Sequence, residues 1–137
     1  MRLIIAGSSG LPETCEVVTK IQGHLEDLGW HGRVTVVISG TAKGADKAGE
    51  LYAARHDIPV ELMPADWKKH KRAAGYRRNE AMAIRASHCL VLWDGKSNGA
   101  RHMIDIARER GLEVAVRRFV AAPPRPRPRR KKKPAKA

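Results

Sequence analysis

The stretch from Val36 to Asp46 combines residue types that could bind an anion. A short apolar run stops at Ser39-Gly40, small residues follow, and a helical pattern begins near Gly44. A strand that turns tightly into a helix presents backbone N–H groups and the positive end of the helix dipole, which together favour a phosphate. Lys43 adds a mobile cation. The stretch therefore predicts half of a phosphate site, although Gly40 and Gly44 could equally serve only to close and pack the turn.

Three further polar turns also follow predicted strands. They lie at residues 7–10, 66–67 and 94–99. In open parallel sheets, ligands bind at the carboxyl ends of the strands, where such turns converge. None of the turns has the P-loop or GxGxxG spacing, and no Ser/His/Asp set is identifiable from spacing. The four turns therefore predict one shared site of a less familiar kind at this edge of the sheet.

The elements that must position these turns alternate regularly along the chain. Short apolar runs predict strands, and apolar residues at helical spacing predict the helices between them. This order predicts an α/β fold, a three-layer Rossmann-like parallel five-stranded sheet with helices on both faces. Pro12 is expected in the first turn of the first helix, and Gly75 is expected to break a basic segment. The expected strands are 2–6, 34–38, 60–63, 88–92 and 113–116, and the expected helices are 12–28, 44–56, 76–86 and 100–110.

The positive charge is concentrated at the end of the chain. The 137 residues carry a net charge of +13, and eight basic residues and no acid lie beyond residue 118, which leaves +5 for residues 1–118. We therefore expect a folded domain at 1–118 and a disordered Pro/Arg/Lys-rich tail at 119–137. Such a tail could contact nucleic acid non-specifically or act only as a solubilising spacer. The residues expected to make this contact are Arg125, Arg127, Arg129, Arg130, Lys131, Lys132 and Lys133.

Composition also excludes several classes of protein. No apolar run approaches the ~20 residues of a membrane span, and the first apolar run is too short for a signal peptide. Cys15 and Cys89 have no metal-binding spacing and are expected to be two buried, reduced thiols of a cytoplasmic protein. His70 and His102 stand alone and are expected at the surface, so no metal and no cofactor are predicted.

Four segments, taken in order, resemble the motifs of the YspA-like (cpYpsA-related) family of the SLOG superfamily, which is named for the Smf/DprA proteins and the LOG cytokinin-activating enzymes. The resemblance covers about residues 2–116. It implies a bacterial or phage protein with a Rossmann-like sheet, a pocket for a nucleotide or a nucleotide derivative, and pairing into a homodimer through helices. The segments are 39–46 (SGTAKGAD), 64–67 (PADW), 75–82 (GYRRNEAM) and 94–99 (DGKSNG).

Two departures from the family patterns affect the expected chemistry. The family usually has Gly-Gly where this chain has Gly40-Thr41. LOG-type phosphoribohydrolases carry a Thr and a Glu where this chain has Ala100 and Met103. Because a methionine cannot transfer protons or stabilise an oxocarbenium, N-glycosidic hydrolysis would need Asp46 or Asp94 as the catalytic group.

The chemistry of the turns assigns a role to each candidate residue. Hydroxyls and glycine N–H groups could hold phosphate, Arg78 could pair bidentately with it, and Asn79 could bond a ribose or a base. Asp46 could accept from a ribose hydroxyl or only complement the helix dipole, and Asp94 could be an acid/base group or a turn residue. Trp67 could stack on a base or cover the core. The predicted ligand-binding residues are Gly7, Ser8, Ser39, Gly40, Thr41, Gly44, Asp46, Asp66, Trp67, Arg78, Asn79, Asp94, Gly95, Ser97 and Gly99.

These observations predict a domain that binds, and could sense, a nucleotide or nucleotide-derived ligand, with a basic tail that contacts nucleic acid. Two alternatives stay open at this stage. One is a LOG-like hydrolase of a nucleotide N-glycosidic bond. The other is a DprA-like protein in which the fold itself binds DNA.

Overall fold

A computed structural model describes residues 1–119 and contains one five-stranded, all-parallel sheet in the order β3-β2-β1-β4-β5. The α/β prediction is therefore confirmed. The sheet is buried on both faces at its centre, since four consecutive residues of β1 and five of β4 are buried. This explains the nearly continuous apolar runs in the sequence. The strands are β1 (Arg2–Gly7), β2 (Val36–Ser39), β3 (Val60–Leu62), β4 (His88–Trp93) and β5 (Glu113–Arg118).

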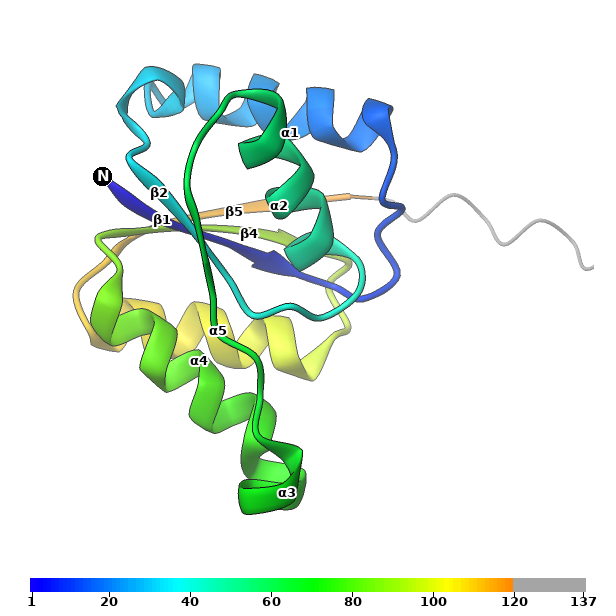
Figure 1. Cartoon of the computed structure of the whole chain (residues 1–137), viewed down its shortest axis with the longest axis vertical. Helices are drawn as coiled ribbons and strands as arrows, with labels where there is room; N and C mark the ends of the chain where they lie inside the picture. The colour runs from blue at the N-terminus through cyan, green and yellow to red at the C-terminus, as the bar shows by residue number, and fades with distance from the viewer. Residues whose placement is uncertain (120–137) are drawn as a thin grey trace, which may run out of the picture.

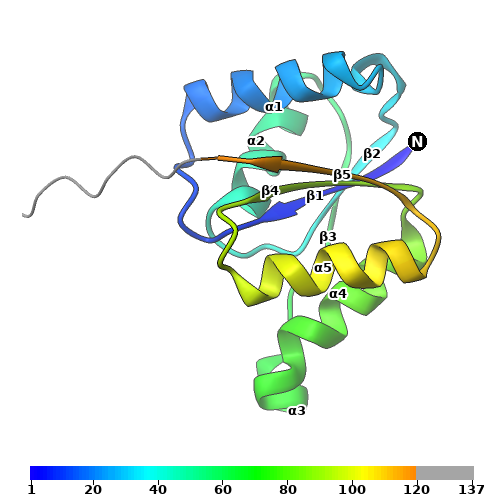
Figure 2. The same ribbon diagram turned by 180° about the vertical axis from the view of Figure 1, so that it is seen from behind.

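Helices cover both faces of the sheet (Figures 1 and 2). The helices α1 (Cys15–Asp27) and α2 (Ala45–Arg55) lie on one face, and α4 (Ala74–Arg85) and α5 (Asn98–Glu109) lie on the other. Alternate strand residues separate two hydrophobic clusters. Leu3 and Ile5 belong to the cluster beneath α1 and α2, whereas Ile4 and Ala6 belong to the cluster beneath α4 and α5.

A short helix, α3 (Trp67–His70), projects from the body of the molecule (Figure 1). It follows β3, and the 3-10 turn η2 (Lys71–Ala73) joins it to α4. A second 3-10 turn, η1 (His31–Arg33), precedes β2. The projection places the basic segment of the sequence at the end of α4 that is nearest the carboxyl edge of the sheet.

Several local predictions were wrong. Helix α1 begins at Cys15, because the Thr14 side chain accepts a hydrogen bond from the Val17 N–H at 3.3 Å, so Pro12 precedes the helix. Cys15 is therefore exposed, and of the two thiols only Cys89 is buried. Helix α4 begins at Ala74, so Gly75, which was expected to separate the basic segment from the helix, lies inside its first turn.

Two large apolar side chains lie on the outer faces of these helices. Leu51 of α2 is 44% exposed, and Ile84 of α4 is 65% exposed. The buried faces carry Ala48 and Ala53 in α2 and Met82 in α4.

The chain changes direction at the boundary between β1 and β4. From β1 it passes through α1 to β2 on one side, whereas from β4 it passes through α5 to β5 on the other. The loops that leave β1 and β4 therefore diverge toward opposite faces and open a crevice at the carboxyl edge of the sheet, which is where ligands bind in such folds.

The described part of the chain ends just after β5. Phe119, which we assigned to the tail, packs against the hydrophobic cluster beneath α1 and α2. The predicted nucleic-acid contacts from Arg125 to Lys133 lie outside the described residues. Within residues 1–119, no helix is both long enough and apolar enough to cross a membrane.

Two glycine substitutions test the packing of α2 on the sheet. A Cβ on Gly49 would lie 2.8 Å from the Ile5 Cβ, whereas a Cβ on Gly23 in α1 would meet no atom within 4 Å. We expect Gly49→Ala to lower the free energy of unfolding by about 1–3 kcal/mol through overpacking. The matched control Gly23→Ala should raise it by up to about 1 kcal/mol through helix propensity.

Urea denaturation measures both free energies. Stabilisation by both substitutions would show that α2 does not approach β1 as closely as the structure indicates.

Candidate functional site

Two adjoining cavities open at the carboxyl edge of the sheet. The inner cavity, of about 170 Å³, lies where the loops after β1, β2 and β4 meet α4. The outer cavity, of about 270 Å³, lies between α3, the start of α4 and the start of α5. The two cavities share Arg78, Asn79 and Gly99. The inner cavity is lined by Ala6, Gly7, Ser9, Ala42, Lys43, Asp46, Arg78, Asn79, Ser97, Gly99, Ala100 and Met103.

Gly40 lies where two opposite charges of the inner cavity, Asp46 and Arg78, approach each other. The Arg78 Nη1 donates to the Gly40 carbonyl oxygen at 2.8 Å. A Cβ on Gly40 would lie 2.7 Å from the Asp46 Oδ2 and 2.8 Å from the Arg78 Cδ, so both side chains close over the glycine. The absence of a side chain at this position is therefore what lets a basic residue from α4 reach the β2–α2 loop.

The neighbouring Thr41 has a left-handed backbone conformation, with φ of 65°. This conformation is unfavourable for a β-branched residue. The Thr41 N–H donates to the Ser39 Oγ at 3.1 Å, and the Ser39 Oγ donates to the Glu50 Oε2 at 2.7 Å. The side chain of Ser39 thus fixes the shape of the loop, and its hydroxyl is already engaged.

Asp46 is the one carboxylate in the wall of the inner cavity among the described residues. Only 5% of its surface is exposed, and its Oδ2 accepts from the Ala42 N–H at 3.2 Å. Burial raises the pKa of Asp46 to about 6, while the nearby Arg78 opposes this shift. The carboxylate is therefore ionised at neutral pH and titrates slightly below it.

Arg78 and Asn79 connect α4 to α5. The Arg78 Nε donates to the Asn79 Oδ1 at 3.3 Å, and the Asn79 Nδ2 donates to the Gly99 carbonyl and to the His102 Nδ1, at 3.3 and 3.1 Å. Asn79 thereby uses its amide hydrogens inside the protein. Among the described residues, the Nη2 of Arg78 has no acceptor, and it is available to a ligand.

Ser8 connects the loops that leave β1 and β4. It is 1% exposed, and its Oγ accepts from the Asp94 N–H at 3.0 Å. Its carbonyl oxygen accepts from the Ala45 N–H at 3.3 Å, and a Cβ on Gly44 would strike that same oxygen. Ser8 and Gly44 therefore hold three loops in register, while the neighbouring Ser9 lines the cavity.

Asp94 serves the turn in which it lies. Its Oδ1 accepts from the N–H groups of Lys96 and Ser97, at 2.8 and 2.9 Å, and these bonds lower its pKa. The Ser97 side chain in turn caps α5 by accepting from the Ala100 N–H. Arg118 of β5 fills the space beside Gly95.

The third strand ends in residues that shape α3. The Asp66 Oδ1 accepts from the Lys69 N–H at 3.0 Å and so caps this helix. Trp67 is 62% exposed and lines the outer cavity, so it does not cover the core.

The structure thus divides the predicted site residues into groups. Those that line a cavity are Gly7, Asp46, Trp67, Arg78, Asn79, Ser97 and Gly99. Ser8, Ser39, Gly40, Thr41 and Gly44 shape the walls, whereas Asp66, Asp94 and Gly95 serve neighbouring turns. The cavity-lining residues outside the predicted set are Ala6, Ser9, Ala42, Lys43, Arg72, Gly75, Tyr76, Ala100 and Met103. The sequence already indicated Lys43 as a cation beside the anion-binding turn, and Ala100 and Met103 as the positions of the LOG Thr and Glu. Proximity to the predicted turns was the main signal for the others.

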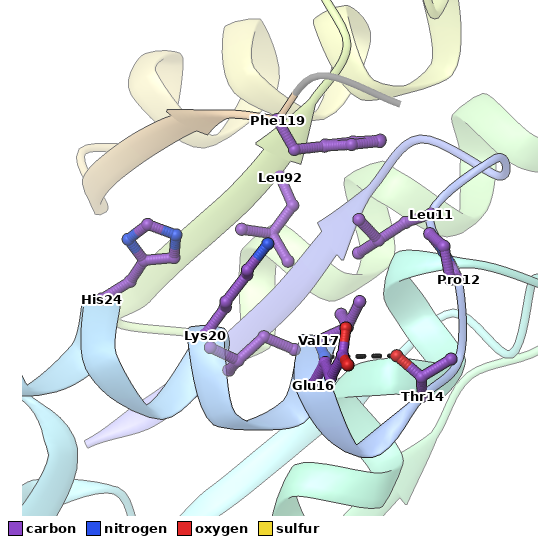
Figure 3. A pocket seen from close by; sticks show the side chains of 10 residues that line it. Leu11, Pro12, Thr14, Glu16, Val17, Lys20, His24, Leu92 and Phe119 are labelled. Atoms are coloured by element: carbon purple, nitrogen blue, oxygen red, sulfur yellow. Dashed lines mark hydrogen bonds between the residues drawn. The ribbon is translucent and has the colours of Figure 1, made fainter. Parts of the chain in front are cut away.

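A third cavity, of about 280 Å³, lies between α1, Leu92 of β4 and Phe119 (Figure 3). Its walls are mainly apolar, and Lys20 and His24 lie along α1 at its rim. It contains none of the predicted site residues. Among residues 1–119, no cluster of three His, Cys, Asp or Glu side chains could hold a metal ion.

The buried carboxylate makes the stability of the fold depend on pH. Because folding raises the pKa of Asp46 from 3.8 to about 6, its contribution favours the folded state most below pH 4 and is lost as the pH rises through 6. We expect Asp46→Asn to lack this dependence. The free energy of unfolding of the variant should therefore rise relative to wild type between pH 4 and 7, by about 3 kcal/mol at most.

Urea titrations of both proteins at pH 4, 5, 6 and 7 measure this difference, and Asp105→Asn, at an exposed position of α5, is the matched control. If the free energies of unfolding of wild type and Asp46→Asn differed by the same amount at every pH, the raised pKa of Asp46 would be contradicted.

Comparison with known proteins identifies the family. The profile of the YspA, cpYpsA-related SLOG family matches residues 1–70, which include the loops after β1 and β2 and the start of α3. The chain is also similar to the Gene 61 protein of Mycobacterium phage D29, with 35% identity over 85 residues that cover 58% of this chain and 68% of the phage protein. No solved structure matches it. The chain therefore belongs to the YspA, cpYpsA-related SLOG family.

Proposed function

We propose that the inner cavity binds a nucleotide or a nucleotide-derived ligand, and that the domain acts as a binding or sensing module. The observation that carries this proposal is Arg78, whose guanidinium faces a cavity at the edge of a SLOG-family sheet. An arginine fixed by hydrogen bonds presents its remaining N–H groups in a defined direction, which suits a phosphate.

Other groups add to the attraction for a phosphate. Helices α2 and α5 both begin at the wall of the cavity, so the positive ends of their dipoles face it. Lys43 lies at the rim, where it is exposed. These groups outweigh the single negative charge of Asp46, which supports an anionic ligand.

Asp46 suits the sugar of such a ligand. At neutral pH its carboxylate accepts hydrogen bonds, and a ribose hydroxyl donates them. Its position between the β2–α2 loop and Arg78 supports this role, because a sugar bonded to Asp46 would lie beside a phosphate bonded to Arg78. This order matches the order of groups in a nucleotide.

The wall of the inner cavity formed by α5 favours binding without cleavage, because it lacks a catalytic carboxylate. Met103, which is 1% exposed, lines the cavity where LOG-type enzymes carry a glutamate. Hydrolysis of the N-glycosidic bond is a second candidate function, because the pKa of Asp46 is raised into the range of a general acid/base.

The identity of a co-purified ligand tests the proposal most directly. We expect mass spectrometry of the denatured protein to show a nucleotide, and we expect nucleotides to raise the melting temperature. Arg78→Met should weaken binding by tenfold or more, because a charge-assisted pair contributes about 1.5–3 kcal/mol. Arg77→Met, at an exposed neighbouring position, is the matched control.

No ligand and no thermal shift with any nucleotide would refute the proposal. Release of free base from a nucleoside monophosphate, abolished in Asp46→Asn, would instead favour the hydrolase.

We further propose that the basic tail contacts nucleic acid without sequence preference. Its clustered charges would release counterions from a phosphate backbone, so the affinity should fall steeply with salt. Truncation after Phe119 should abolish the binding of a labelled oligonucleotide in a mobility-shift assay at low salt. Binding that survives the truncation would place the contact on the folded domain, as in the DprA-like alternative.

A further inference from the structure

The outer cavity continues the inner one toward α3. The two share Arg78, Asn79 and Gly99, so a ligand anchored at Arg78 can extend from one into the other. Each cavity alone is smaller than the roughly 300 Å³ at which ligand pockets begin, whereas together they reach that range. A nucleotide therefore needs both cavities.

Two aromatic side chains line the outer cavity and remain open to solvent. Trp67 is 62% exposed and Tyr76 is 44% exposed, although both are large and apolar. Tyr76 is held edge-on to His102, with ring centroids 4.5 Å apart, and His102 is fixed by Asn79. Exposed aromatic rings beside a phosphate-binding group suit the face of a nucleobase, which gains about 1–3 kcal/mol from such stacking.

The polar groups of the outer cavity are mainly hydrogen-bond donors. Arg72 and Arg78 both line it, and a guanidinium can only donate. Guanine presents two adjacent acceptors, O6 and N7, which pair bidentately with an arginine. Adenine presents a donor, its N6 amino group, beside N7, and this group would face the guanidinium unfavourably.

From this arrangement we infer that the ligand is a guanine nucleotide whose base enters the outer cavity. The base stacks on Trp67 and Tyr76, and Arg72 reads its O6 and N7 edge, while the phosphate and ribose occupy the inner cavity. This inference rests on the proposed function and names the ligand class of the same site.

Titration of the full chain with GMP, AMP and UMP tests the inference. We expect GMP to bind about tenfold more tightly than AMP, from one bidentate pair. It should also quench the tryptophan fluorescence, because Trp67 is far more exposed than Trp30 and Trp93. Arg72→Ala should abolish the preference for GMP, whereas Lys69→Ala, an exposed charge on the same projection that does not line the cavity, should leave it unchanged.

Substitutions of Trp67 separate stacking from charge. Trp67→Ala should weaken the binding of all three nucleotides by about tenfold, and Trp67→Phe should retain the affinity and lose most of the quenching. Equal affinities for GMP and AMP, or unchanged affinities in Trp67→Ala, would overturn the inference and leave nucleotide binding by the inner cavity intact. The absence of binding by any nucleotide would refute the proposed function itself.

Discussion

The hydrogen bond from Arg78 to the Gly40 carbonyl joins the two halves of the molecule at the site. Arg78 belongs to α4 on one face of the sheet, and Gly40 belongs to the loop that leads to α2 on the other. A bond between a charged donor and a carbonyl is stronger than a neutral one, and here it links the β2–α2 loop to α4. The inner cavity depends on this contact, because its walls come from both faces.

The same contact explains why Asp46 remains charged at neutral pH despite its burial. A carboxylate that is only 5% exposed loses much of its hydration, which favours its protonated form. Arg78 offsets part of this cost from across Gly40, and the Ala42 N–H offsets another part. The pKa stays near 6 as a result, and the site keeps one negative and two positive side chains, Arg78 and Lys43, at its wall.

The fold was predictable from the sequence, and the division of labour within the site was not. Strands that are buried on both faces leave continuous apolar runs, so the succession of five strands along the chain could be predicted. Parallel strands all end at one edge of the sheet, so the meeting of their loops could be predicted as well. The sequence does not reveal which polar groups are already engaged. Ser8 was predicted to bind the ligand, and Asp94 was predicted either to bind it or to shape a turn. In the structure the Ser8 Oγ accepts from the Asp94 N–H, and Asp94 bonds its own turn. Such pairings depend on tertiary register. The start of α4 was placed two residues late, because a glycine is not expected inside a first helical turn, yet Gly75 lies there.

The position of Asp46 beside the proposed phosphate subsite links ligand binding to protonation. Below pH 6 its carboxyl group is largely neutral, and a bound phosphate then meets two positive side chains without opposition. Above pH 6 the carboxylate repels a phosphate but accepts more strongly from a ribose hydroxyl. A negative charge bound nearby raises the pKa of a carboxyl group, whereas a hydrogen bond donated to the carboxylate lowers it. The phosphate and the ribose of a nucleotide therefore shift the pKa of Asp46 in opposite directions. The direction in which nucleotide binding shifts its pKa reports which half lies closer to it.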